Sequence, residues 1–374
     1  STTANYLGFF NEDFKKYTPN LDRIASKSLV MSNHYCQEPA SLKSLYSILT
    51  GRYPYRTRNW KRFVKRTVKD ISIAQILKKH GYDTLYLTSE HGKVYYQDRF
   101  LKGRFNRIID RNALIRSGYR HRVYSMGMDD RVLIKSFDKF LNKSSKKFFV
   151  FLAPVFPHHP YHVPSKKFRI NRKRGRFNRY KNSLFFADYI IGQIYKLLHK
   201  HKKINNTLVV IFSDHGEAFY QHPGNYLHSI YLYDENVKTF CIFSNPVLFE
   251  KSVYAPVTRH IDIVPTVLDL LGINHGAWNF DGISLLKKHD NIFAPLYTSF
   301  SNSYLGLRDS KWKYIINRRY NSEELYDLSN DSDEKINLTV KYPDLCKTFK
   351  ERLLLFENYR GDLNIQRIKR APKK

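Results

Sequence analysis

An aspartate and a histidine stand next to each other directly after an apolar run that has the composition of a buried strand. Asp214 and His215 follow the run at residues 208–212, and a glycine comes after them. Ligand sites in open α/β sheets lie at the carboxyl ends of the strands, where this pair would emerge. A carboxylate beside an imidazole suits a hard or borderline divalent cation, and the glycine permits close approach of the backbone. Taken alone, the pair is more typical of a loop cap, so its meaning depends on the rest of the sequence.

The apolar runs of the chain predict the elements that would hold this pair. Residues 146–154, 207–212 and 239–243 are rich in aromatic, aliphatic or β-branched residues, which fits strands buried on both faces of a parallel sheet. Between the first two runs, apolar residues recur at helical spacing: Ala187, Ile190, Ile191, Ile194, Leu197 and Leu198. The segment 73–79 has the same spacing and leads into a further strand at 82–87. This alternation predicts a layered α/β sheet.

The later part of the chain predicts a helix and then a smaller unit. Pro265 fits the first turn of a helix that ends near Leu271, with Gly272 as its C-terminal cap. After about residue 285 the sequence becomes polar and irregular. We therefore expect a large unit over residues 1–285 and a C-terminal subdomain over residues 286–374 that completes the fold.

Basic residues outnumber acidic residues by almost two to one. The 374 residues include 64 Lys and Arg against 33 Asp and Glu, which gives a net charge of +31. Such a field favours polyanions or anionic membrane surfaces. Nine of the basic residues fall in segment 166–181, which we expect to be an exposed loop, either simply solvated or forming a rim that steers substrate. No signature of a specific nucleic-acid-binding fold accompanies the charge.

Cysteine content and hydropathy add little about the compartment. The chain has three scattered cysteines, Cys36, Cys241 and Cys346, which excludes a disulfide framework and a paired-cysteine metal site. No apolar run reaches the length of a membrane span, and the first residues lack the order of a signal peptide.

Seven short segments share their residues and their order with a known family. They lie at residues 18–25, 41–54, 157–161, 232–235, 262–266, 281–285 and 324–328. The first begins Thr-Pro-Asn-Leu-Asp, the second ends in Leu-Thr-Gly-Arg-Tyr-Pro, and the third is Pro-His-His-Pro-Tyr. In these segments the chain resembles the sulfatase family of the alkaline phosphatase superfamily, including its phosphoglycerol and phosphoethanolamine transferase-like members. The resemblance implies an α/β/α sandwich with a mostly parallel central sheet and a small C-terminal subdomain.

The same resemblance implies a role for several polar residues. It places the family nucleophile at Ser41, although a helix N-cap is the alternative reading of that hydroxyl. Asp214 and His215 would bind a metal ion together with Ser41, and His158 and His228 would contact the anionic group of the substrate.

Other positions match the family less closely. Lys93 lies in a loose match to Gly-Lys-x-His and is a candidate anion contact. His159 and His222 lie near the matching segments, and we expect at least one of them to be only structural. Lys43 and Leu45 depart from Cys/Ser-x-Pro/Ala-x-Arg, the signature for converting the nucleophile to formylglycine, so we expect an unmodified serine.

The resemblance implies attack by a metal-activated Ser41 oxygen on sulfur or phosphorus, followed by hydrolysis or transfer of the covalent ester. One divalent ion is expected, Ca, Mg, Mn or Zn. The broken formylglycine signature favours phosphate esters, whereas segment 308–314 looks more like true sulfatases. The alternative is a catalytically degenerate member that binds an anionic glycan or lipid without turning it over.

Partners and location are also implied by the resemblance. The expected substrate is a sulfated or phosphorylated glycan or lipid headgroup, with membrane-surface association and no specific nucleic acid. A periplasmic, extracellular or membrane-associated location would follow. Family members begin with a strand that ends in acidic metal ligands; we expect that strand to be missing from this chain or supplied otherwise.

Overall fold

The structure, a computed structural model, describes residues 1–124, 126–287, 289, 292–300 and 304–369, with only the backbone described over residues 359–369. Its strands are β1 (Leu29–Tyr35), β2 (Asp83–Thr88), β3 (Arg107–Ile109), β4 (Phe148–Ala153), β5 (Val209–Phe212), β6 (Ala218–Phe219), β7 (Tyr226–Leu227), β8 (Lys238–Ser244), β9 (Ser252–Arg259), β10 (Ala294–Tyr297), β11 (Tyr304–Arg308), β12 (Trp312–Asn317) and β13 (Ser322–Asp327). Its α-helices are α1 (Pro19–Ala25), α2 (Ser41–Thr50), α3 (Trp60–Thr67), α4 (Ile73–Lys79), α5 (Gln97–Leu101), α6 (Arg111–Arg116), α7 (Arg131–Lys143), α8 (Arg176–Lys200), α9 (Asp234–Val237), α10 (Ile263–Leu270) and α11 (Pro343–Lys369).

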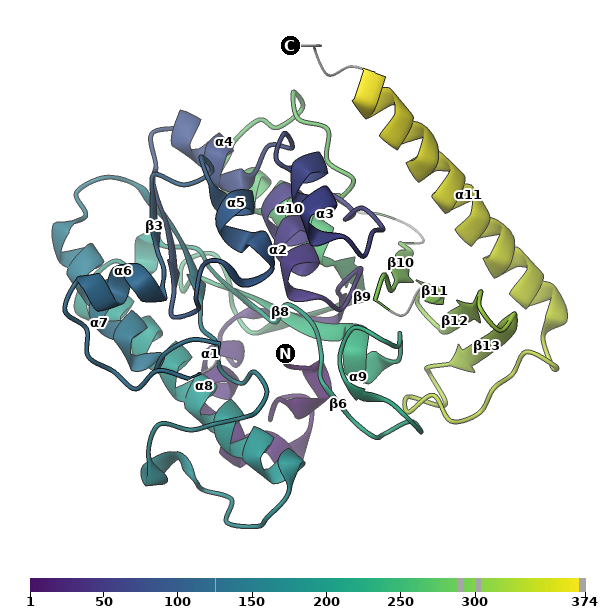
Figure 1. Cartoon of the computed structure of the whole chain (residues 1–374), viewed down its shortest axis with the longest axis horizontal. Coiled ribbons are helices and arrows are strands. Elements are labelled where there is room, and N and C mark those ends of the chain that lie inside the picture. Colours follow the sequence, from purple (N-terminus) through teal and green to yellow (C-terminus); the bar gives the residue numbers. More distant parts are fainter. Residues whose placement is uncertain (125, 288, 290–291, 301–303, 370–374) are drawn as a thin grey trace.

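Two sheets form the centre of the larger unit (Figure 1). In one sheet β3, β2 and β4 lie in that order and are parallel. In the other the order is β5, β8, β1 and β9, and β1 and β9 are parallel. The four expected strands are present as β2, β4, β5 and β8, and the α/β fold class with a mostly parallel sheet is confirmed. One correction concerns β8, which runs antiparallel to both of its neighbours.

Helices cover both faces of the strands. On one face α2, α3, α4 and α10 pack against the sheets, and Leu45, Leu77 and Val264 share a cluster with Phe243 of β8. On the other face α7 and α8 contribute Leu133 and Leu198 to a cluster with Leu85 and Leu87 of β2. Because successive strand residues point to opposite faces, an apolar residue at nearly every strand position is what this sandwich requires.

The site-bearing helix α2 has a defined end. It stops at Gly51, whose φ of +63° is left-handed, and the amide of that glycine donates to the carbonyl of Ser47. A side chain at this position would carry the strain of a positive φ and would also meet Phe280 at about 3.0 Å. The Thr-Gly-Arg-Tyr-Pro sequence therefore closes the helix tightly against the segment around Phe280.

A gap separates the two central sheets between β4 and β5. Each of these strands has a hydrogen-bonded neighbour on one side only, β2 for β4 and β8 for β5. A cavity of about 810 Å³ lies between them, lined by both strands and by apolar residues of α8 and α10. All described side chains of β4 and β5 are partly exposed, although their composition predicts full burial. No strand occupies this position among the described residues, where one more strand would join the two sheets.

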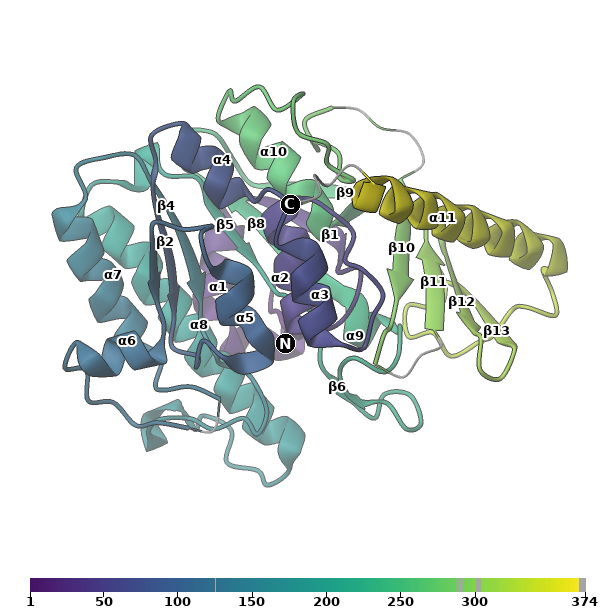
Figure 2. The same cartoon turned by 45° about the horizontal axis from the view of Figure 1, so that its top comes forward.

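The C-terminal part contains an antiparallel sheet of β10, β11, β12 and β13 beside the long helix α11 (Figure 2). Phe349 and Leu353 of α11 pack with Tyr314 and Leu325 of this sheet. Within the described part of the chain, no helix combines the length and apolarity that crossing a membrane requires.

The basic segment 166–181 is only partly the loop that we expected. From Arg176 onward it belongs to α8. The aromatic residues between the basic ones supply the reason, because Phe177, Tyr180 and Leu184 lie on one side of the helix and pack into a cluster with Tyr6. The remaining residues before Arg176 form an irregular stretch that begins with a single 3-10 turn.

We expect backbone amides of β4 and β5 to exchange hydrogen faster than those of β2 and β8. Each strand of the first pair has one unpaired edge facing the cavity, whereas each strand of the second pair has neighbours on both sides. Amide hydrogen exchange followed by mass spectrometry on the 374-residue chain measures this difference. Equal protection of all four strands would show that polypeptide fills the gap in solution.

Candidate active site

Ser41, His215 and Asp214 meet at the carboxyl end of β5. The Oγ of Ser41, the first residue of α2, lies 3.0 Å from Nε2 of His215. Oδ2 of Asp214 lies 3.2 Å from the same nitrogen. The N-cap of α2 is Ala40, and the Ser41 hydroxyl makes no capping bond, so the reading of Ser41 as a helix cap is wrong. Residues more than 170 positions apart are thus brought together as the sequence predicted.

The protonation of His215 follows from its hydrogen bonds. Nδ1 lies 2.9 Å from the carbonyl oxygen of Gly216, which can only accept, so Nδ1 carries the proton. Burial holds the pKa of His215 well below its usual value, and the imidazole is therefore neutral with a lone pair on Nε2. That lone pair faces the Asp214 carboxylate and the Ser41 hydroxyl. One nitrogen and two oxygen donors converging in this way fit a divalent cation.

The N-terminus of the chain lies at the same point. The ammonium group of Ser1 is 2.5 Å from Oδ1 of Asp214, and the Thr2 amide donates to the carbonyl of His215. Burial alone would raise the pKa of Asp214, but the interactions of its carboxylate with the His215 ring and the Ser1 nitrogen hold it below its usual range. Asp214 is therefore an ionised carboxylate that already attracts a cation. A Cβ on Gly216 would lie 2.1 Å from the carbonyl oxygen of Glu235, which explains why a glycine follows His215.

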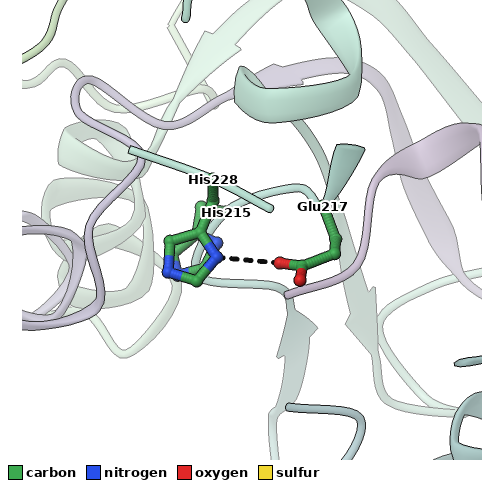
Figure 3. Close-up of side chains that lie close together, drawn as sticks. All are labelled: His215, Glu217 and His228. Carbon is green, nitrogen blue, oxygen red and sulfur yellow. Dashed lines mark hydrogen bonds and ion pairs between the residues drawn. The ribbon is translucent and has the colours of Figure 1, made fainter. Parts of the chain in front are cut away.

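His228 is positioned by a buried glutamate (Figure 3). Its Nδ1 donates to Oε2 of Glu217 at 2.8 Å, and the ring lies 4.0 Å from that of His215. The other oxygen of Glu217 accepts from the Tyr161 hydroxyl at 2.5 Å. His215, Glu217 and His228 are close enough to hold a metal ion. Because both oxygens of Glu217 are already occupied, we assign it to fixing His228 rather than to a ligand set.

His158 is held on a loop by a buried carboxylate. Asp130 accepts from the amides of Val155 at 3.1 Å and Phe156 at 3.0 Å, and also from the hydroxyl of Ser89. Nδ1 of His158 donates to the carbonyl of His159 at 2.7 Å, and the ring lies 6.2 Å from that of His228. Burial lowers the pKa of His158. Its Nε2 is therefore an available lone pair near the site.

A cavity of about 210 Å³ lies beside some of these groups, although His215 and His228 are not among its described lining residues. Ser41, Asp214 and His158 line it together with Glu90. Lys93 is exposed and is not among its lining residues in the described part of the chain, although Glu90 and Val94 are. The sequence analysis missed Glu90, whose pKa is raised to about 8 by burial and by the charge of Asp214. Its position just after the predicted strand at 82–87, like that of Asp214 after β5, is the signal that could have found it.

Two further polar residues are structural. His222 is buried, with Nδ1 2.7 Å from Glu235 and Nε2 2.9 Å from the carbonyl of Glu334, as the expectation of at least one structural histidine requires. Lys43 is also buried, and its Nζ donates to Oε1 of Glu38 at 2.7 Å and to the carbonyl of Thr57 at 2.9 Å.

Comparison with known proteins identifies a family and a shared fold. The family model named Sulfatase matches residues 1–273. Human arylsulfatase K is 30% identical over 192 residues, which cover 46% of this chain and 35% of the human protein, so the match spans about a third of that relative. The crystal structure of a Vibrio parahaemolyticus protein in the alkaline phosphatase superfamily aligns with this chain at a TM-score of 0.76 and 17% identity. The alignment covers 97% of this chain and 85% of that one.

A further solved structure was determined in complex with its substrate, D-glucosamine-2-N,6-O-disulfate. It aligns with a TM-score of 0.72 at 16% identity, over 100% of this chain and 97% of that chain. At these identities both structural matches establish the shared fold.

Asp130 should make stability depend on pH. Burial raises its pKa to about 7 from 3.8, so folding favours the protonated form, and this stabilisation is complete below about pH 4 and lost as pH rises through 7. Asp130→Asn cannot ionise, so its free energy of unfolding should fall less between pH 5 and 8 than that of the unsubstituted chain. Urea unfolding across this range measures the two slopes. Asp333→Asn, at an exposed site, is the matched control, and equal slopes for all three proteins would contradict the assignment.

Proposed function

The chain belongs to the sulfatase family, and from this premise we propose that it is a metal-dependent hydrolase that cleaves sulfate esters through a covalent Ser41 intermediate. One observation carries the proposal: Ser41 Oγ lies 3.0 Å from Nε2 of His215, in a cavity that also contains the Asp214 carboxylate. Nucleophile, metal-binding groups and a space for the ester are therefore adjacent.

The proposed reaction has two displacements. The Ser41 oxygen attacks sulfur, the bond from sulfur to the leaving oxygen breaks, and that oxygen takes up a proton. Water then attacks the Ser41 ester, which releases sulfate and restores the hydroxyl. A cation held by Asp214, His215 and Ser41 would lower the pKa of the serine hydroxyl. His158 and His228 would contact the oxygens of the ester, with His228 kept in place by Glu217.

Phosphate ester cleavage or transfer is the second candidate. Lys43 and Leu45 replace residues of the formylglycine signature, which favours an unmodified serine. Both oxyanions are tetrahedral and would meet the same donors, so the reacting group is decided by the nucleophile rather than by the shape of the cavity.

The substrate class follows from the charge of the protein and the names of its relatives. A net charge of +31 attracts polyanions, and one structural neighbour is described with a disulfated sugar as substrate. We propose a sulfated or phosphorylated glycan ahead of a lipid headgroup. A periplasmic, extracellular or membrane-associated place of action belongs to the same proposal.

Ser41→Ala should lower kcat by at least about a thousandfold without loss of folding, because it removes the nucleophile and little buried contact. Turnover of an aryl ester by metal-supplemented protein measures the loss. Ser47→Ala is the matched control on the same helix, since the buried Ser47 Oγ has no hydrogen-bond partner. Similar turnover by Ser41→Ala and the unsubstituted chain would refute the covalent Ser41 mechanism, and no turnover by either protein would leave a binding protein as the remaining function.

A substrate panel separates the two candidate reactions. Aryl sulfate, aryl phosphate monoester and phosphodiester are compared with Ca, Mg, Mn or Zn added after chelation. We expect turnover of the sulfate ester, loss of activity on chelation and recovery with one of the ions. Preferential turnover of a phosphate ester, with an unmodified Ser41 in the peptide mass, would establish the second candidate instead.

A further inference from the structure

A second cavity lies beside the start of α8 and has Tyr161 among its lining residues. Its volume is about 470 Å³. Its basic lining residues are Arg122, Arg169, Arg172, Lys173 and Arg179. The other lining residues are Tyr124, Tyr161, His162, Val163, Asn171 and Asn182. No carboxylate is among these described lining residues, so they give the cavity positive charge without a counter-charge of their own.

The basic side chains of the cavity also make no direct ion pairs among the described residues, since none of the five is joined to a carboxylate there. Burial lowers the pKa of His162, and the positive charges of Arg122 and Arg179 lower it further. The His162 ring therefore lies in the electric field of both guanidinium groups. The first turn of α8 has no acidic residue, so its positive dipole end adds to the same field.

The floor of the cavity is rigid. Oδ1 of Asn182 accepts from the Asn171 amide and its Nδ2 donates to the Asn171 carbonyl, both at 2.8 Å. The Asn171 side chain donates to Asn178 at 2.8 Å and to Tyr17 at 3.1 Å. These hydrogen bonds hold the irregular stretch before α8 against the helix. They therefore restrict the backbone that carries Arg169, Arg172 and Lys173.

An aromatic ring belongs to the cavity wall. The ring of Tyr124 stacks on His162 at 5.5 Å, and the Arg122 guanidinium lies 5.4 Å from the ring centre. The Tyr124 hydroxyl is buried and makes no hydrogen bond to the residues that the structure describes.

The cavity is connected to the candidate active site through one side chain. Tyr161 lines the cavity and its hydroxyl donates to Glu217, which in turn holds His228. His158 and Tyr161 belong to the same short turn, in which the Tyr161 amide donates to the His158 carbonyl. The residue that contacts the ester in the proposed function and a lining residue of the basic cavity are thus three positions apart on one turn.

We propose that this basic cavity is a second anion-binding site, which holds another sulfate or phosphate group of the oligosaccharide whose ester is cleaved beside Ser41. The proposal rests on the proposed function and adds that the substrate carries at least two anionic groups. Four of the five cations are arginines, which bind oxyanions through paired N–H donors. The concave shape and the Tyr124 ring suit a sugar unit better than the flat surface of a membrane.

Binding of a fully sulfated heparin-derived tetrasaccharide tests the proposal. Isothermal titration in the Ser41→Ala background removes turnover from the measurement. Arg172→Ala/Lys173→Ala and Arg122→Ala/Arg179→Ala should each raise Kd by roughly tenfold or more, because charge-assisted hydrogen bonds are lost. These side chains are exposed, so thermal unfolding should change little.

Lys78→Ala/Lys79→Ala is the matched control, because it removes the same charge from exposed residues at the end of α4. Equal Kd for the cavity variants and this control would overturn the proposal. It would also be overturned if the cavity variants lost binding to phosphatidylserine vesicles but kept the tetrasaccharide. Turnover of an aryl ester by the chain with native Ser41 tests the proposed function separately, so the two failures are distinguishable.

Discussion

The site depends on two groups that lie 3.2 Å apart, the neutral imidazole of His215 and the ionised carboxylate of Asp214. The same imidazole nitrogen lies 3.0 Å from the Ser41 hydroxyl. Because a buried negative charge beside a nitrogen lone pair is unfavourable, this arrangement attracts a cation. Glu90, which lines the same cavity as Asp214, has its pKa raised to about 8, because it is buried and because a second negative charge near Asp214 is unfavourable. The protonation of Glu90 is thus coupled to the charge of Asp214.

The histidines around this centre are fixed by hydrogen bonds from outside the cavity. Glu217 fixes His228 and Asp130 fixes the loop that carries His158. A third buried cluster fixes the C-terminal sheet: Nζ of Lys313 lies 2.8 Å from Asp234 and 2.9 Å from Glu334. Since breaking one partner of a buried pair leaves an uncompensated charge, this cluster ties the sheet to the segment just after His228.

The sequence predicted the positions of strands, which depend on composition. It did not predict the direction of a strand or a site residue whose partners lie far away along the chain. The apolar runs placed β2, β4, β5 and β8 correctly, although only β2 and β8 are buried as their composition predicts and the side chains of β4 and β5 stay partly exposed. They could not reveal that β8 is antiparallel, since an apolar run has no direction. The meeting of Ser41 with His215 came from the family resemblance, whereas Glu90 was missed because a lone glutamate after a strand has many structural explanations.

Lys43 is one of the two residues at which helix α2 departs from the formylglycine signature, and its contacts belong to the packing of the helix. Lys43 is buried beside Glu38 and the Thr57 carbonyl, and Nζ lies 5.6 Å from the ring centres of Trp60 and Phe63. Burial lowers the pKa of Lys43 while Glu38 opposes that change, so the lysine serves an ion pair within the packing of α2. Ser41 points the other way, toward His215. The Ser41 hydroxyl therefore lies beside His215 and Asp214, whereas Lys43 on the same helix is occupied by the packing.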